Sequence, residues 1–170
     1  MHTIDTPAQA VDPRELRNAL GRFATGVCVV TTVGEDGRAA GLTVNSFSSV
    51  SLDPPLVAWC LGRKAPSLTA FSAAEYFAVH VLAADQQHIA MHFAKPSENK
   101  FALLQGELQQ GIGNVPVLTH ALARFECRKS ATTDCGDHVM FFGQVERFTY
   151  QSRAPLVFHA GRFVEDARAA

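Results

Sequence analysis

Residues 41–55 have the sequence GLTVNSFSSVSLDPP, in which apolar and small polar side chains alternate as in a β-strand. The even positions include Leu42, Val44, Val50 and Leu52, and the odd positions include Thr43, Asn45, Ser49 and Ser51. Because side chains alternate between the faces of a strand, this pattern predicts one apolar and one hydrogen-bonding face. Gly41 precedes the strand and Asp53-Pro54-Pro55 ends it. The polar face has two interpretations, the wet side of a half-exposed strand or a surface that holds a ligand.

The segments on either side of this stretch also have β patterns. Residues 27–33 are apolar and β-branched, and the turn Gly34-Glu35-Asp36-Gly37 leads from them to Thr43, which predicts a hairpin. Further strands are expected at residues 56–61, 76–82, 121–130, 138–149 and 156–159. Short helices are expected at residues 66–74 and 85–93, and residues 95–116 are expected to be mostly loop.

A further helix is expected to begin at Asp12-Pro13, because Asp is a good N-cap and Pro suits the first helical position. It would end at Gly26. The residues expected on one face of it are Leu16, Ala19, Leu20 and Phe23. Residues 1–12 lack periodicity and are expected to be a flexible tail, so the folded domain is expected to span residues 13–165.

The composition is that of one globular domain. The chain has 170 residues, of which 47% are hydrophobic, and this is enough for a core. A net charge of -1 without a long basic block argues against nucleic-acid binding. The apolar stretches are far shorter than the roughly 20 residues that span a bilayer, so no membrane association is expected. The N-terminus has no secretion signal, which favours a cytoplasmic protein.

The four cysteines are expected to be free thiols. None forms a Cys-x-x-Cys pair, and the histidines lack a third partner at metal-ligand spacing, so no metal site is expected. Cys28 and Cys60 lie in apolar strand patterns and are expected in the core.

The fold class is mainly β. About six strands joined mostly by turns, with a few short helices, favour an antiparallel barrel over a doubly wound parallel sheet. No Gly-x-Gly-x-x-Gly follows a strand and no Gly-x-Ser-x-Gly is present, so neither a Rossmann site nor a serine hydrolase is favoured.

Three further segments could carry chemistry, and each also has an ordinary structural interpretation. Gly136-Asp137-His138 precedes an apolar strand, so His138 could reach a ligand at the barrel rim or simply belong to a turn. Lys64-Ala65-Pro66-Ser67 begins a short helix and could meet a phosphate, or be a capped helix beside a surface lysine. His159-Ala160-Gly161-Arg162-Phe163 could clamp an anionic or planar ligand, or be a solvated strand end.

Taken in order, these motifs resemble the short-chain flavin reductase family, the NAD(P)H:flavin oxidoreductases that supply reduced flavin to two-component monooxygenases. The segments that carry the resemblance are residues 21–27 (GRFATGV), 41–55, 77–82 (FAVHVL), 136–138 and 159–163. The resemblance implies an FMN-binding split barrel of Greek-key topology that forms a homodimer. The family usually has Asn at the position of His80 and commonly Thr at the position of Cys28.

The resemblance also implies roles for individual residues. The segment expected along the flavin ring is Thr43, Val44, Asn45, Ser46 and Phe47. Ser49 would lie near the ribityl-phosphate chain, and the phosphate would meet Lys64, Ala65, Pro66 and Ser67. Phe93 and Phe101 would lie near the flavin. His138, as the catalytic-site residue, and His159, Gly161 and Arg162 would contact the nicotinamide nucleotide.

The resulting hypothesis is an enzyme that binds FMN or FAD and transfers a hydride from NADH or NADPH to the flavin N5, the chemistry being that of the cofactors. A transient partner monooxygenase would receive the reduced flavin. Two alternatives are a non-catalytic FMN-binding electron carrier of the same barrel and a barrel that dimerises without a ligand.

Overall fold

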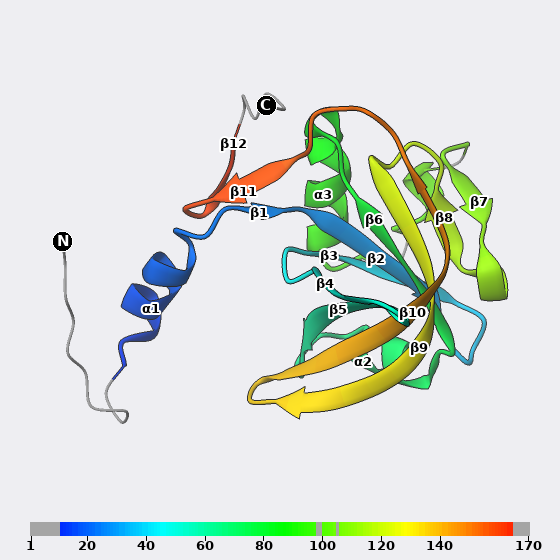
Figure 1. The fold of residues 1–170 in the computed structure, drawn as a ribbon, viewed down its shortest axis with the longest axis horizontal. Coiled ribbons are helices and arrows are strands. Elements are labelled where there is room, and N and C mark those ends of the chain that lie inside the picture. Colours follow the sequence, from blue (N-terminus) through cyan, green and yellow to red (C-terminus); the bar gives the residue numbers. More distant parts are fainter. Residues whose placement is uncertain (1–10, 98–99, 105, 165–170) are drawn as a thin grey trace.

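Seven antiparallel strands form the main sheet of the protein (Figure 1). The computed structural model describes residues 11–97, 100–104 and 106–164, so of the tail predicted at residues 1–12 all but the last two residues lie outside the described residues. The strand order is β3-β2-β6-β9-β10-β5-β4, and the sheet curls into a barrel (Figure 1). The strands are β2 (Cys28–Val33), β3 (Ala39–Val44), β4 (Ser48–Leu52), β5 (Pro55–Gly62), β6 (Tyr76–Val81), β9 (Ala123–Cys135) and β10 (His138–Tyr150). The predicted antiparallel, mainly β architecture is confirmed.

Tight turns connect neighbouring strands in the barrel. The β2–β3 turn is closed by a bond from the Gly37 amide to the Gly34 carbonyl, and Gly37 has a φ of 74°. The β9–β10 turn contains Gly136 with a φ of 60°. Glycine adopts this left-handed conformation without the steric cost that a side chain would add. Both hairpins therefore follow from the turn residues present in the sequence.

Residues 41–55 do not form the single strand predicted from their alternation. β3 ends at Val44 and β4 begins at Ser48, and these strands lie at opposite ends of the sheet order. Ser46 holds the crossing between them, because its hydroxyl accepts a bond from the Cys60 amide (2.9 Å) and donates to the Cys60 carbonyl (3.3 Å). The segment therefore passes from one edge of the sheet to the other and brings the two edges together.

The apolar face predicted for this stretch is also wrong beyond the crossing. Val44 is buried, whereas the side chains of Val50 and Leu52 are 49% and 95% exposed. The alternation identifies two strand segments, but the change of direction at residues 45–47 gives them different surroundings.

The barrel interior is an aromatic cluster around Trp59. Its ring stacks on Phe141 at 4.7 Å between centroids and makes edge contacts with Phe71 at 4.9 Å and Phe77 at 5.8 Å. Such pairs are stabilising beyond the area they bury. Cys28 is in this core as predicted, and burial raises the pKa of its thiol to about 12. Cys60, also predicted in the core, is only partly buried.

Two short helices cover openings of the barrel. Helix α2 (Leu68–Ala73) buries Phe71, and helix α3 (Gln87–Ala94) follows the 3-10 turn η1 (Ala84–Gln86) and packs against β2 and β3. Ile89 and Phe93 of α3 are buried in a second apolar cluster with Val29 and Leu118. The predicted helices at residues 66–74 and 85–93 are confirmed within a few residues.

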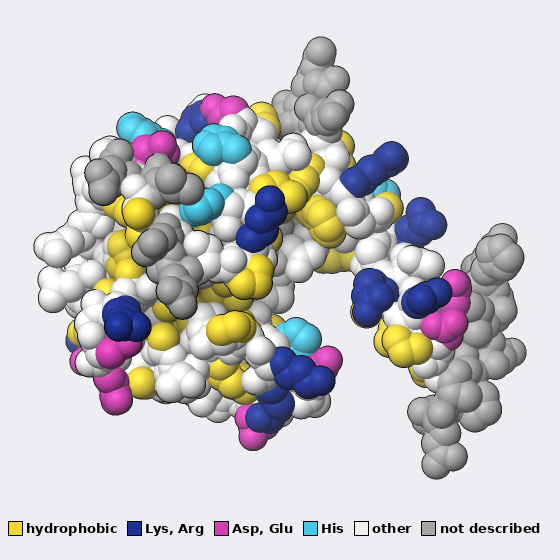
Figure 2. Space-filling view, turned by 180° about the vertical axis from the view of Figure 1, so that it is seen from behind, with side chains coloured by type: hydrophobic (Ala, Val, Ile, Leu, Met, Phe, Trp, Pro, Cys, Tyr) yellow, Lys and Arg dark blue, Asp and Glu magenta, His cyan; other side chains and the backbone are white. Residues whose placement is uncertain are grey.

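Helix α1 (Pro13–Leu20) stands apart from the barrel on an arm formed by residues 12–23 (Figures 1 and 2). Its predicted N-cap is confirmed, because the Asp12 side chain accepts a bond from the Arg14 amide at 2.7 Å. The helix ends at Leu20, earlier than predicted, and none of its residues is buried. The predicted apolar face is therefore exposed, with Phe23 just beyond the helix 78% exposed.

The remaining elements are short. Strands β1 (Thr25–Gly26), β11 (Val157–His159) and β12 (Arg162–Val164) form a small sheet beside the arm, and of these β1 and β12 were not predicted. Residues 95–116 were expected to be mostly loop, but about half of the described ones lie in short elements, namely η2 (Ala102–Leu104), β7 (Leu108–Gln110), η3 (Ile112–Asn114) and the start of β8 (Pro116–Leu118), which pairs with β7. In the described part of the chain, no helix is long and apolar enough to cross a membrane.

Candidate functional site

A groove of about 1070 Å³ opens between β3, the loop that leads into α2 and the end of α3. This volume suits a ligand of nucleotide size. The residues that line it are Arg38, Ala39, Ala40, Gly41, Leu42, Thr43, Ala65, Pro66, Ser67, Phe93, Ala94, Pro96, Ser97, Lys100, Phe101 and Ala102.

One wall of the groove is built from two phenyl rings packed on a glycine. The rings of Phe93 and Phe101 meet edge to face at 5.4 Å between centroids. A Cβ at Gly41 would lie 2.8 Å from Cε1 of Phe93 and 3.1 Å from Cζ of Phe101. The absence of a side chain on β3 therefore allows both rings to reach the strand, and we call these three residues the aromatic wall.

The polar groups beside the aromatic wall already have partners within the protein. The Thr43 hydroxyl donates to the Ala90 carbonyl at 2.6 Å and ties β3 to α3. The Lys100 ammonium donates to the carbonyls of Gly41 (2.9 Å) and Phe93 (2.8 Å). Burial lowers the pKa of Lys100. Among the described lining residues, Arg38 and Lys100 supply the cations.

Six residues predicted from the sequence line this groove together, although they come from three separate segments. They are Thr43, Ala65, Pro66, Ser67, Phe93 and Phe101. The prediction did not include Arg38, the β3 residues 39–42 or Lys100. The strand alternation could have indicated the earlier β3 positions, whereas nothing local distinguishes Lys100 from the neighbouring Lys95.

The rest of the predicted flavin segment lies beside the groove and does not line it. Val44 is buried in the core, and Phe47 stacks on Phe125 at 5.6 Å between centroids. The Ser46 hydroxyl is occupied by Cys60. Three other predicted residues are exposed: Asn45 just after β3, Ser49 on β4, and Lys64 in the loop before α2.

His138 lies at the start of β10, where its register partner on β5 is Gly62. Its Nδ1 is 2.7 Å from Oδ1 of Asp137, and this hydrogen bond and the histidine's charge lower the pKa of Asp137. The side chain is exposed and does not line the groove. Because Gly62 is three residues before Ala65, the backbone nevertheless places His138 close to the loop that forms one side of the groove.

The predicted nicotinamide segment near the C-terminus is not part of the groove. His159 and Arg162 pair across the β11–β12 turn, where Gly161 has a φ of 80°. Ala160, which follows His159, donates a hydrogen bond from its amide to the Gly21 carbonyl at 2.8 Å. This turn therefore packs against the end of the arm. The structure does not bring His159, Gly161 or Arg162 together with His138 within the groove.

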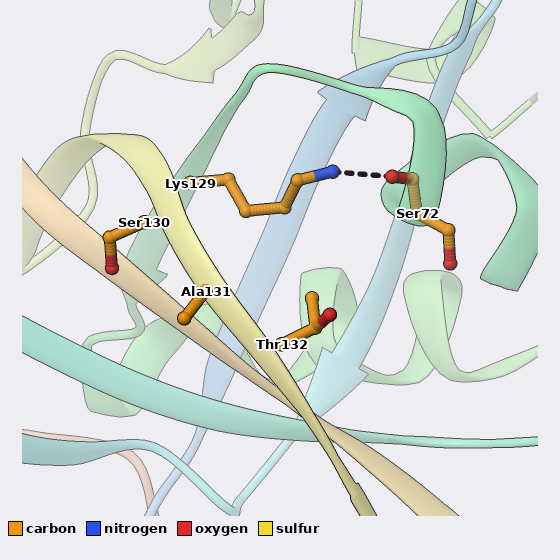
Figure 3. A pocket seen from close by; sticks show the side chains of 5 residues that line it. All are labelled: Ser72, Lys129, Ser130, Ala131 and Thr132. Atoms are coloured by element: carbon orange, nitrogen blue, oxygen red, sulfur yellow. Dashed lines mark hydrogen bonds between the residues drawn. The ribbon is translucent and has the colours of Figure 1, made fainter.

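A second hollow, of about 200 Å³, lies beside Lys129 on β9 (Figure 3). The Lys129 ammonium donates to the carbonyls of Phe71 and Ser72 at the C-terminal end of α2. Lysine commonly stabilises the unpaired carbonyls at a helix C-terminus in this way. We therefore assign this hollow to helix capping. In the described residues no group of three or more His, Cys, Asp or Glu side chains could hold a metal ion.

Comparison with known proteins assigns the class. Residues 20–165 match the family described as flavin reductase like domain, and the chain belongs to this family. It is 46% identical over 150 residues to FMN reductase (NADH) SmoA of Agrobacterium fabrum, covering 88% of this chain and 84% of that protein. Two other relatives are longer: the chain spans 45% of a probable flavin reductase of Rhizobium meliloti and 49% of the reductase component of a trigonelline monooxygenase of Acinetobacter baylyi.

Solved structures agree with the fold. The NADH:FAD oxidoreductase SgcE6 of Streptomyces globisporus C-1027 is 38% identical with a TM-score of 0.85, covering 96% of this chain and 100% of that one. BorF, the flavin reductase component of a bacterial two-component tryptophan halogenase, is 38% identical with a TM-score of 0.83, covering 90% and 97%. The predicted family and its split-barrel fold are therefore confirmed.

Proposed function

We propose that this protein is an NAD(P)H-dependent flavin reductase that binds FMN or FAD in the groove beside β3. The observation that carries the proposal is the groove itself, which has a nucleotide-sized volume and an aromatic wall in a chain of the flavin reductase family. Phenyl rings provide the apolar, planar contacts that an isoalloxazine ring requires. NADH is the expected reductant, because several relatives are named for it, and NADPH is the alternative.

The loop before α2 is suited to the phosphorylated tail of the flavin. Ala65, Pro66 and Ser67 line the groove, and the Ser67 side chain makes no capping bond to its own helix. Lys64 is exposed immediately before them and supplies positive charge. We propose that this loop meets the phosphate while the aromatic wall lies near the ring.

The residues of the protein bind and orient, and the bound flavin supplies the hydride-accepting N5. Flavin and nicotinamide must be held at roughly 3 to 3.5 Å for transfer. We propose that backbone amides between Thr43 and Ser46 donate hydrogen bonds where negative charge develops on the ring, because preorganised donors stabilise such charge. Val44 and Ser46 would act through the backbone, since their side chains are already committed. His138 would position the nicotinamide, because hydride transfer needs no general acid.

The test is to purify the protein and follow the oxidation of NADH, and separately of NADPH, with and without added FMN or FAD. Binding is measured separately by the visible absorbance and fluorescence of the flavin. Flavin-dependent NADH oxidation is the expected result. Binding of FMN without any NADH or NADPH oxidation would instead support the electron carrier, and no flavin binding under any condition would contradict both.

We propose that the protein works as a homodimer. The arm exposes Leu16, Leu20 and Phe23, and the ends of β4 and β10 expose Leu52, Phe148 and Tyr150. Large apolar side chains gathered on a separate arm are typical of an interface. A second copy of this chain is the occupant that the family resemblance favours.

We also propose a cytoplasmic location and a transient partner monooxygenase. All four cysteines are free, which suits a reducing compartment. Reductase components of monooxygenases are among the relatives, including HsaB of Rhodococcus jostii, which is 36% identical over 157 residues. Reduced flavin would pass from this protein to such a component.

A further inference from the structure

We infer that Lys100 is a positioning residue whose ammonium joins the end of α3 to the free edge of β3 and so holds the aromatic wall in place. We call its bonds to the carbonyls of Gly41 and Phe93 the Lys100 bridge. The inference rests on the proposed function for its effect on flavin, but the bridge itself is a property of the protein alone.

Both carbonyls belong to places where regular structure leaves acceptors unpaired. Phe93 is in the last turn of α3 (Gln87–Ala94), where carbonyls have no partner within the helix. Gly41 is on β3, the terminal strand of the sheet order, whose outer carbonyls face no neighbouring strand. One ammonium satisfies an acceptor of each kind, and a cation near a helix C-terminus is further favoured by the helix dipole.

The backbone of Lys100 is also bonded to α3. Nε2 of His92 on α3 donates to the Lys100 carbonyl at 2.7 Å. The ammonium also lies 6.0 Å from the centroid of the Phe93 ring, at the outer limit of a cation–π contact. Main chain and side chain therefore both connect Lys100 to α3.

These contacts explain how the Lys100 ammonium can stay charged although it is partly buried. Burial lowers the pKa of Lys100, so the charged form needs compensating partners, and two charge-assisted bonds to carbonyls provide them. Arg38, the other cation among the described lining residues, is exposed and faces its neighbour Asp36. Lys100 is thus the cation built into the wall of the groove.

The consequence is geometric. Phe93 and Phe101 can pack on Gly41 only while α3 and β3 keep their separation. Without the bridge, the Thr43–Ala90 hydrogen bond still ties β3 to α3 one turn earlier, but the last turn of α3 loses its own bond to the strand, and the wall no longer presents one fixed surface to a planar ligand. Loss of this preorganisation weakens binding more than it slows a reaction step that occurs after binding.

The experiment compares Lys100→Met with Lys129→Met. Lys129 makes the same kind of bond at the end of α2 but does not line the groove, so it controls for the loss of one helix-capping lysine. FMN affinity is measured by fluorescence titration. We expect Lys100→Met to weaken FMN binding by about tenfold, with kcat at saturating FMN within about twofold of the wild type, and Lys129→Met to leave FMN affinity unchanged.

Amide hydrogen exchange of the flavin-free protein tests the bridge without any ligand. We expect faster exchange at residues 41–44 and 89–94 in Lys100→Met and no change there in Lys129→Met. Lys100→Arg keeps a charged donor and is expected to lie between the wild type and Lys100→Met in both readouts.

Unchanged FMN affinity or unchanged exchange in Lys100→Met would overturn the inference, as would a larger effect in Lys100→Arg. If the wild type binds no flavin while exchange increases in Lys100→Met, the proposed function fails and the bridge stands.

Discussion

His138 does not line the groove, but it lies next to the loop before α2 that forms one side of the groove. It does so because His138 at the start of β10 pairs with Gly62 at the end of β5. If it positions the nicotinamide, His138→Ala should raise the KM for NADH about tenfold, which corresponds to the loss of one or two ordinary hydrogen bonds. The kcat at saturating NADH should change much less. Steady-state kinetics of NADH oxidation at saturating FMN measure both constants.

His120→Ala is the matched control, because His120 is exposed on a different loop. A KM for NADH that is unchanged in His138→Ala would remove His138 from the nucleotide site.

His80 is a histidine of the opposite kind, fully buried on β6 with Nδ1 donating to the Val29 carbonyl at 3.0 Å. Burial lowers its pKa to about 4; the bond to Val29 opposes this, and the nearby charge of Arg124 adds to it. The folded protein therefore holds His80 neutral, while the unfolded chain takes up a proton near its ordinary pKa of about 6.5. Stability should be fully present above about pH 6.5 and fall as the pH drops towards 4.

The loss should be about 3 kcal/mol at pH 4, because each pKa unit between about 6.5 and about 4 is worth about 1.4 kcal/mol and folded His80 is itself half protonated at pH 4. His80→Asn keeps a polar side chain of similar size but removes this titration. Melting temperatures between pH 7 and 4 should therefore fall less steeply for His80→Asn than for the wild type. Parallel curves for the two proteins would show that other groups cause the acid sensitivity.

At the scale of elements, Gly41 determines how closely α3 approaches β3. In Gly41→Ala the new Cβ meets the Phe93 ring at 2.8 Å, so the ring or the helix must shift. We expect a cost of about 1 to 3 kcal/mol in unfolding free energy and a weaker FMN affinity, because overpacking displaces the aromatic wall. Chemical denaturation and FMN titration measure the two effects.

Gly26→Ala is the control, since a Cβ at Gly26 meets nothing within 4 Å. Equal effects of the two substitutions would mean that packing on the aromatic wall is not the cause.

Most helices and strands were predictable from the sequence, and the errors show what local sequence does not encode. The β2–β3 hairpin follows from its glycine turn and β-branched strand, and α1 begins where Asp12 caps it. Residues 41–55 were predicted as one strand because alternation of side chains continues through both β3 and β4. The break at residues 45–47 depends on the bonds between Ser46 and Cys60, which are 14 positions apart, and alternation contains no information about them.

At the scale of the whole molecule, the arm is the feature that a single chain does not explain. Its helix buries none of its residues, although it has a predicted apolar face. If a second copy covers this face, Leu20→Asp combined with Phe23→Asp should convert a dimer to a monomer, because charges would enter an apolar interface. Sedimentation velocity at micromolar concentration measures the change.

Asn18→Asp adds a negative charge to the same helix outside the predicted apolar face and should leave the dimer intact. A wild-type protein that sediments as a monomer would contradict the proposed homodimer directly.

The sequence by itself determined the mainly β class, most strand positions, the start of α1 and the family, because turn residues, side-chain alternation and short motifs are local properties. It also located six groove residues through the family resemblance. Only the tertiary structure decided that β3 and β4 separate, that α1 leaves the barrel, and that Lys100 joins α3 to β3. The physical reason is that each of these depends on which distant backbone groups and side chains meet, and such contacts are set by the fold of the whole chain.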